Sequence, residues 1–327
     1  MSTLLKWKVV IFCVFIQTVF AGCPHKYCES CISSKRIEGY IDVDKGSLYY
    51  QSFGHGDPVI VLHGGPGLDQ GYLLPQLLAL AGNYQLIFYD QRGSGRSLKT
   101  ELSPEYINIA QFVEDLEVLR KSLGFNKFTL MGHSWGGLLA MQYAIKHRDQ
   151  LSGLILLSTA PADYEGQNAF ASEFGLRTQS IIDEIKPLFS FDDFKKLNAA
   201  QISALYRKIF SVYFDNPDKV EELSLNFTVD SARSGYQVDE EMSKTAWLQP
   251  SVNLLPDLKK LDVPTLIVHG RQDIIPIWTA VEIHKAIPGS EMAILEECGH
   301  FPYIEQPRDF FVKVTDFLSK MRLGTSK

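Results

Sequence analysis

The hydrophobic residues of this chain follow two spacings, and each spacing predicts one kind of element. Short, almost continuous hydrophobic runs are typical of strands that are buried on both faces. Four such runs precede residue 160, at residues 58–65, 84–90, 127–132 and 151–158. Hydrophobic positions at helical spacing separate them, at residues 73–81, 109–123 and 135–147. Buried strands that alternate with amphipathic helices predict a mostly parallel sheet flanked by helices.

The pattern changes on both sides of this region. Residues 36–43 and 47–54 have the pattern of a hairpin with a turn at residues 44–46. Residues 161–247 show only helical patterns, most clearly at 202–214. The alternation then resumes, with strands at residues 263–270 and 291–297 and helices at residues 280–286 and 308–318. A helical block between two parallel strands cannot lie in the sheet, so we expect a cap over the carboxyl ends of the strands, where open parallel sheets bind ligands.

The N-terminal residues differ from the rest of the chain. Lys6 and Lys8 precede a hydrophobic run of 12 residues at 9–20, which is too short to span a bilayer and has the basic flank of a secretory signal. We therefore predict a signal peptide at residues 1–22 and an exported protein, with a buried or membrane-anchoring helix as the alternative. The sequence FAGC also resembles a bacterial lipoprotein signal, in which Cys23 would be lipidated and anchor the protein to a membrane.

The expected organisation is a cysteine-containing leader at 23–35, a core in two halves at 36–160 and 248–327, and the cap at 161–247. In an exported chain, Cys28 and Cys31 predict a local disulfide. No second ligand pair follows at the spacing of a metal site, so we expect no metal there. The formal charge is −6 and no long run of Lys or Arg is present, which argues against nucleic acid as a partner.

A candidate nucleophile lies where the strand at 127–132 meets the following helix. Residues 132–136 read Gly-His-Ser-Trp-Gly, and Gly-x-Ser-x-Gly between a strand and a helix is a nucleophile elbow. Such a turn strains the serine backbone, and only glycine fits at the flanking positions. The alternative is a chance occurrence of this pattern in a loop. The flanking elements favour the elbow, and Ser134 is therefore the expected nucleophile.

A serine hydroxyl needs a base, and the base needs an orienting carboxylate. Asp273 and His300 each follow one of the later strands, so both are expected at the same sheet edge as Ser134. His269 is the rival base, but its position at the end of a strand suits a core histidine. Asp90 lies at the correct edge but comes too early in the chain for the acid. The sequence thus predicts a triad of Ser134, Asp273 and His300.

The intermediate of acyl transfer also needs backbone N–H donors for its oxyanion. Trp135 directly follows the nucleophile, and its N–H is one candidate. The second is the N–H of Gly65, in the loop sequence His-Gly-Gly-Pro-Gly at residues 63–67, because Pro66 has no N–H. This glycine-rich sequence does not predict a phosphate site, since the lysine and hydroxyl of a P-loop are missing.

Three motifs together resemble the proline iminopeptidases, which are α/β-hydrolases with a helical cap. They are HGGPG at residues 63–67, DQRGSGRS at 90–97 and GHSWGG at 132–137, within a resemblance that extends over about residues 46–318. The resemblance implies an α/β-hydrolase fold and a serine enzyme that removes an N-terminal residue, typically proline, without cofactor or metal. It implies the same triad and the same oxyanion donors.

Two departures from this family concern the elbow and the substrate. His133 occupies a position where many members have glycine. The family binds the substrate's ammonium group with glutamates of the cap, but the chain has Ser234-Gly235 where one of them is expected. The remaining candidates for substrate binding are His63 and four acidic residues, which on a cap usually belong to a solvated surface: Glu221, Glu222, Glu240 and Glu241.

The sequence therefore predicts a serine aminopeptidase of the proline iminopeptidase type that acts on small peptides through an acyl-enzyme. The enzymatic alternative is the same chemistry on a small ester, lactone or amide. A non-catalytic interaction module is the third hypothesis, although such modules usually lose a triad member and this sequence retains all three.

Overall fold

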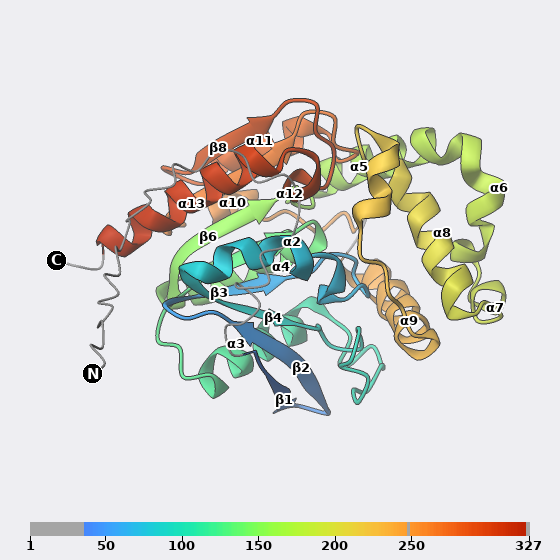
Figure 1. The fold of residues 1–327 in the computed structure, drawn as a ribbon, viewed down its shortest axis with the longest axis horizontal. Helices are drawn as coiled ribbons and strands as arrows, with labels where there is room; N and C mark the ends of the chain where they lie inside the picture. The colour runs from blue at the N-terminus through green and yellow to red at the C-terminus, as the bar shows by residue number, and fades with distance from the viewer. Residues whose placement is uncertain (1–35, 247–248, 325–327) are drawn as a thin grey trace, which may run out of the picture.

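The computed structural model describes residues 36–246 and 249–324, and it has the predicted α/β-hydrolase fold with a helical cap (Figure 1). The predicted signal peptide and leader, with Cys23, Cys28 and Cys31, lie outside the described residues. Within the described part of the chain, no helix is both long and hydrophobic enough to cross a membrane.

An eight-stranded sheet forms the core, in the order β1-β2-β4-β3-β5-β6-β7-β8. The strands are β1 (Ile37–Val43), β2 (Gly46–Phe53), β3 (Asp57–Leu62), β4 (Tyr84–Tyr89), β5 (Phe128–His133), β6 (Leu151–Leu157), β7 (Thr265–Gly270) and β8 (Glu291–Leu295). Strands β1 and β2 form the predicted antiparallel hairpin, and β2 also pairs antiparallel with β4. The remaining pairs are parallel. The sheet is therefore mostly parallel, as the hydrophobic runs indicated.

The strand order changes direction between β3 and β5. The chain runs from β3 to β4 on one side and later returns to place β5 on the other side of β3, with Leu62 aligned with Gly132. The loops that follow β3 and β5 consequently leave the sheet edge as neighbours. Such a switch point is where open α/β sheets bind their ligands.

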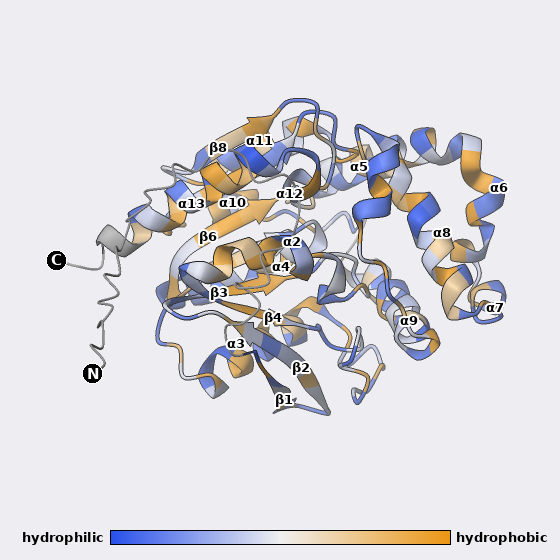
Figure 2. Ribbon diagram, viewed as in Figure 1, coloured by the Kyte–Doolittle hydropathy of each residue, from blue (hydrophilic) through white to orange (hydrophobic). Residues whose placement is uncertain are grey.

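Both faces of the sheet are buried, and successive strand residues pack into different layers. In β3, Ile60 and Leu62 belong to one hydrophobic cluster, whereas Val59 and Val61 belong to the other. The first cluster is covered by α3 (Ile109–Ser122), α4 (Trp135–His147), α10 (Leu255–Leu258) and α11 (Ile277–Ala286). The second is covered by α2 (Leu74–Leu77), α12 (Pro302–Glu305) and α13 (Pro307–Gly324). Figure 2 shows the hydrophobic residues gathered on the central strands.

Some element boundaries differ from the sequence prediction. The single helix expected at 73–81 is instead the short helix α2 followed by a 3₁₀ turn at Leu78–Gly82, a geometry that is common at helix ends. Helix α11 begins at Ile277, three residues before the predicted start at 280, because Pro276 precedes it and α-helices readily begin after a residue in extended conformation.

The cap lies between β6 and β7 and has a small hydrophobic cluster of its own. It consists of α5 (Tyr164–Thr178), α6 (Ile182–Ile185), α7 (Phe191–Phe194), α8 (Ala199–Ser211) and α9 (Val229–Thr245), seen on the right of Figure 1. Capping boxes fix the starts of two of the helices that face the site, with Asn198 and Gln201 at α8 and Thr228 and Ser231 at α9.

Helix α9 meets the core at a contact between two backbones. A Cβ on Gly235 would lie 2.1 Å from the carbonyl oxygen of Gly67, and a Cβ on Gly67 would lie 2.1 Å from that of Gly235. Next to this contact, the Ser234 hydroxyl donates to the carbonyl of Gly93 at 2.6 Å. Ser234 and Gly235 stand where the family resemblance suggested a glutamate. They hold the cap against the two core loops that carry Gly67 and Gly93.

We predict that Gly235→Ala lowers the melting temperature, because the new methyl group must displace backbone atoms and such overpacking costs roughly 1–3 kcal/mol. Thermal unfolding followed by circular dichroism measures this effect. Gly175→Ala is the matched control, since a Cβ on this glycine of α5 would meet nothing within 4 Å and alanine favours the helix. Equal melting temperatures for the two variants would contradict the prediction.

Candidate active site

The Gly-x-Ser-x-Gly sequence forms the predicted sharp turn between β5 and α4. Ser134 has φ 57° and ψ −123°, a conformation that is strained for a residue with a Cβ. The Ser134 N–H donates to the carbonyl of Leu157 at 3.0 Å, and the Ser134 carbonyl accepts from the N–H groups of Gly137 and Ala160 at 2.8 and 2.9 Å. These hydrogen bonds hold the serine in place above the sheet edge.

The two glycines of the pattern are required because backbone atoms approach them closely. A Cβ on Gly132 would lie 2.2 Å from the carbonyl oxygen of Gly136, and a Cβ on Gly136 would lie 2.6 Å from that of Leu62. The second contact places the first turn of α4 directly against the end of β3. The elbow and the start of the loop at residues 63–67 are therefore packed together through their backbones.

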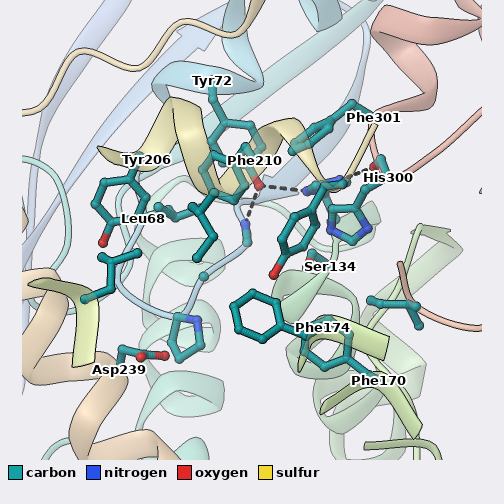
Figure 3. A pocket seen from close by; sticks show the side chains of 18 of the residues that line it. Leu68, Tyr72, Ser134, Phe170, Phe174, Tyr206, Phe210, Asp239, His300 and Phe301 are labelled. Carbon is teal, nitrogen blue, oxygen red and sulfur yellow. Dashed lines mark hydrogen bonds between the residues drawn. The ribbon is translucent and has the colours of Figure 1, made fainter. Parts of the chain in front are cut away.

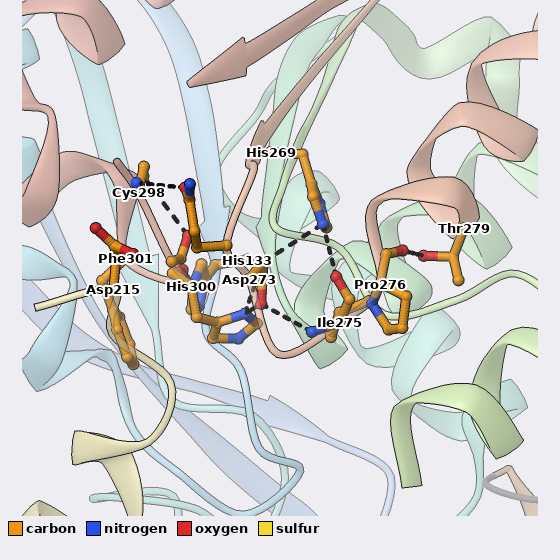
Figure 4. Close-up of polar contacts among 12 residues, drawn as sticks. His133, Asp215, His269, Asp273, Ile275, Pro276, Thr279, Cys298, His300 and Phe301 are labelled. Atoms are coloured by element: carbon orange, nitrogen blue, oxygen red, sulfur yellow. Dashed lines mark hydrogen bonds and ion pairs between the residues drawn. The ribbon is translucent and has the colours of Figure 1, made fainter. Parts of the chain in front are cut away.

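Asp273 and His300 meet at the same edge, although 26 residues separate them along the chain. The His300 Nδ1–H donates to both carboxylate oxygens of Asp273, at 2.9 and 3.1 Å (Figure 4). With its proton on Nδ1, the imidazole has an unprotonated Nε2, and His300 and Ser134 line one cavity (Figure 3). These positions support His300 as the candidate general base.

Asp273 is buried, yet its surroundings favour the carboxylate. Burial alone would raise its pKa, but the neighbouring imidazoles of His300 and His269 and the N–H of Ile275, which donates to Oδ1 at 3.0 Å, together hold the pKa below its usual value. His269 is fully buried, and its Nε2–H donates to the Ile275 carbonyl at 2.9 Å (Figure 4). It is the core histidine that its position in the strand suggested.

The loop after β3 presents Gly65 to the cavity. His63 fixes this loop from below, because its Nδ1–H donates to the carbonyl of Gly64 at 2.8 Å and its Nε2 accepts the N–H of Gln91 at 3.0 Å. A trans peptide group directs its N–H opposite to its carbonyl, so the Gly65 N–H points away from His63. Trp135 begins α4, where backbone N–H groups favour negative charge.

Burial lowers the pKa of His63 to about 4, so this imidazole is neutral at physiological pH. His63 is not among the residues that line the cavity, and the prediction that it binds substrate is corrected: its side chain supports the loop instead. Gln91 extends the support to the elbow, since it also accepts a hydrogen bond from the Trp135 indole at 3.0 Å.

The cap contacts the loops that carry Asp273 and His300. Arg177 of α5 donates to the carbonyls of Gln272 and Asp273, both at 3.1 Å. The His300 N–H donates to the carbonyl of Tyr213, just after α8, at 2.8 Å. Glu305 accepts the N–H of Gly299 at 2.9 Å and that of Asp215 at 2.8 Å. The position of the cap and the geometry of the catalytic loops are thus coupled.

A cavity of about 340 Å³ lies between the cap and the sheet edge, and Ser134 is on its wall. The cap wall is mostly aromatic, and these side chains are Phe170, Phe174, Tyr206, Phe210, Tyr213 and Tyr236. Among the described residues that line the cavity, Asp239 is the only one with a carboxylate. The cavity therefore suits a small substrate with a hydrophobic part and one cationic group.

Asp239 projects from α9 into the cavity (Figure 3). The surrounding protein raises its pKa to about 6, because burial disfavours the charged form. The Asp239 carboxylate has no hydrogen bond or ion pair with another described residue. An unpaired carboxylate at the wall of a hydrophobic cavity is a site where a cationic ligand would be stabilised.

The structure corrects the prediction for the cap glutamates. None of the four lines the cavity: Glu221 pairs with Arg207 at 3.0 Å, Glu241 pairs with Lys244 at 2.7 Å, and Glu222 and Glu240 are exposed. Asp239 precedes Glu240 by one residue, which on a helix rotates a side chain by about 100°. Helical spacing places Asp239 on one face with Tyr236, three residues earlier, and the fold shows that this face lines the cavity.

Comparisons with known proteins identify the family and the fold. The alpha/beta hydrolase fold family matches residues 57–307 of the chain. The proline iminopeptidase of Saccharolobus solfataricus is 30% identical over 87% of this chain and 93% of its own length. That of Heyndrickxia coagulans is 29% identical over 87% of this chain and 99% of its own length.

Solved structures with the same fold have various described activities. A hydrolase from Bacillus anthracis has a TM-score of 0.69 at 21% identity, over 86% of this chain and 99% of its own. The proline iminopeptidase of Mycobacterium smegmatis has a TM-score of 0.65 at 20% identity, over 89% and 100%. Est816, described as an N-acyl homoserine lactone degrading enzyme, has a TM-score of 0.62 at 22% identity, over 85% and 100%. At these identities the likeness concerns the fold alone.

Proposed function

The chain belongs to the α/β-hydrolase family, with proline iminopeptidases among its relatives, and from this premise we propose that it is a serine aminopeptidase that releases an N-terminal residue from small peptides. The observation that supports the proposal most is the pair of Ser134 and Asp239 on the walls of one cavity. A hydroxyl beside a base can attack an acyl carbon, and the carboxylate can bind the free amine of the same substrate.

The reaction follows from the positions of the groups. His300 takes the proton of Ser134 as the Oγ attacks the acyl carbon, and Asp273 stabilises the imidazolium that forms. The N–H groups of Gly65 and Trp135 are the proposed oxyanion donors. The amine of the next residue leaves with a proton from His300, and a water molecule, activated in the same way, hydrolyses the acyl-enzyme.

We predict that the purified protein releases the chromophore from a prolyl-arylamide and that Ser134→Ala lowers the rate at least about 10⁴-fold, because the covalent step is lost. Spectrophotometric initial rates measure both. Hydrolysis of nitrophenyl esters without turnover of any aminoacyl-arylamide would replace the aminopeptidase proposal by an esterase, which the hydrophobic cavity also accommodates.

For Asp239, we predict that Asp239→Asn raises the KM for the arylamide roughly tenfold or more, since its ion pair with the substrate's ammonium group is lost. With the wild type, KM should rise about tenfold for each pH unit below about 6, where Asp239 becomes protonated. The variant should lack this pH dependence. Glu240→Gln, the neighbouring exposed carboxylate on α9, is the control and should leave KM unchanged.

The stability of the same variant gives an independent measurement. The folded-state pKa of Asp239 is raised, so its stabilising contribution is complete below the usual value of 3.8 and is lost as the pH rises through about 6. Asp239→Asn should therefore raise the melting temperature more at pH 8 than at pH 5.

A KM that responds to Asp239→Asn and Glu240→Gln alike would contradict the assignment of Asp239 as the residue that binds the substrate's amine.

We also propose that the protein is exported, on the basic and hydrophobic pattern of its first 22 residues. Expression of the full chain followed by intact-mass analysis should then show a mature protein that begins near Gly22 or Cys23. An added diacylglycerol mass on Cys23 would identify a lipoprotein, whereas a full-length cytoplasmic product would refute export.

A further inference from the structure

A continuous chain of hydrogen bonds, which we call the relay, joins the loop at residues 63–67 (the oxyanion loop) to the loop that carries His300 (Figure 3). The N–H of Gly64 donates to the hydroxyl of Tyr72 at 2.7 Å, and this hydroxyl contacts Nδ1 of His133 at 2.8 Å. The Nε2 of His133 contacts the carbonyl oxygen of His300 at 2.9 Å. Tyr72 and His133 are 3% and 2% exposed, so water does not compete for these bonds.

The direction of every bond in this chain is determined. A carbonyl oxygen only accepts, so the Nε2 of His133 carries the proton that it donates to His300. The Tyr72 oxygen accepts the Gly64 N–H and donates its own proton to Nδ1, which is therefore unprotonated. Burial, with a smaller contribution from His300, lowers the pKa of His133 to about 3, so the ring remains neutral. One tautomer satisfies all three contacts.

We propose that Tyr72 and His133 are positioning residues for hydrolysis, which hold the oxyanion loop and the loop of His300 at a fixed separation on the two sides of Ser134. This inference rests on the proposed serine hydrolase function. His133 is the middle residue between Gly132 and Ser134, so the relay passes through the elbow itself. Neither side chain is assigned a proton transfer or an oxyanion contact.

The relay fixes one of the two peptide groups that adjoin Gly64, and His63 fixes the other. Tyr72 holds the Gly64 N–H, and His63 holds the Gly64 carbonyl from the other side at 2.8 Å. Because the Gly65 N–H belongs to the same planar group as that carbonyl, its direction is fixed as well. On the far side of Ser134, the carbonyl of His300 accepts from His133, while its N–H donates to Tyr213. Loss of the relay leaves each loop held at one end only.

The test is Tyr72→Phe, which removes one hydroxyl and keeps the ring. We expect kcat for both an ester and an arylamide to fall roughly 10- to 100-fold, less than or equal to the loss caused by deleting an oxyanion donor, while KM changes less than about twofold. His133→Ala should give a similar loss, and His133→Gln, which keeps an N–H donor for the His300 carbonyl, should recover part of it. Stopped-flow measurement of acylation separates this step from deacylation.

Tyr303→Phe is the matched control. Tyr303 also packs against the His133 ring, with centroids 5.7 Å apart, but its buried hydroxyl has no hydrogen-bond partner in the described part of the chain. We expect an unchanged kcat. The double variant of Tyr72→Phe and His133→Ala should be no slower than about twice the slower single variant, because the two act through one relay. Multiplied losses, or a lower melting temperature with unchanged kcat in Tyr72→Phe, would overturn the proposal.

A measurement without turnover separates this proposal from the function on which it rests. In ¹⁵N-histidine NMR spectra, His133 should show a protonated Nε2 and an unprotonated Nδ1 at all pH values from roughly 5 to 8. Tyr72→Phe should alter the signals of both His133 and His300. If the wild type hydrolyses nothing, the function fails but these signals still decide on the relay. A titrating His133, or the opposite tautomer, would refute the relay whatever the activity.

Discussion

The left-handed backbone of Ser134 constrains the rest of the site. Such a conformation costs of order 1–3 kcal/mol, and it persists because Gly132 and Gly136 have no side chains to collide with the neighbouring backbone and because three backbone hydrogen bonds hold the serine. Since the turn fixes where the hydroxyl leaves the sheet, the other groups must reach that point. The ends of β3, β7 and β8 bring Gly65, Asp273 and His300 to it.

Burial then determines where the protons lie. His63 and His133 are both withdrawn from water, which disfavours their charged forms, and each has one nitrogen that donates and one that accepts. Asp273 is equally buried but remains charged, because it has hydrogen-bond donors and neighbouring imidazoles. The same low-dielectric surroundings thus keep His63 and His133 neutral and Asp273 charged. His300 lies on the wall of the cavity.

The cap contributes the shape of the cavity and, among the described residues that line it, the one carboxylate. Helix α9 approaches the oxyanion loop as closely as two glycines allow, and it presents Asp239 to the cavity from the next turn. Arg177 and Tyr213 join the cap to the loops of the acid and the base. A displacement of the cap would therefore alter the catalytic geometry as well as the space for substrate.

The sequence by itself determined the fold and the residues at the strand ends, because hydrophobic periodicity and the glycine pattern are local properties. Continuous hydrophobic runs predicted the buried strands, and Ser134, Asp273 and His300 each follow one of them. Only the tertiary structure decided which cap residue faces the cavity, since Asp239 and Glu240 are adjacent acids that differ by one step of helix rotation. It also decided the roles of His63 and His133. Their partners, Gln91, Tyr72 and the His300 carbonyl, are distant in sequence and become neighbours only because β3 lies beside β5.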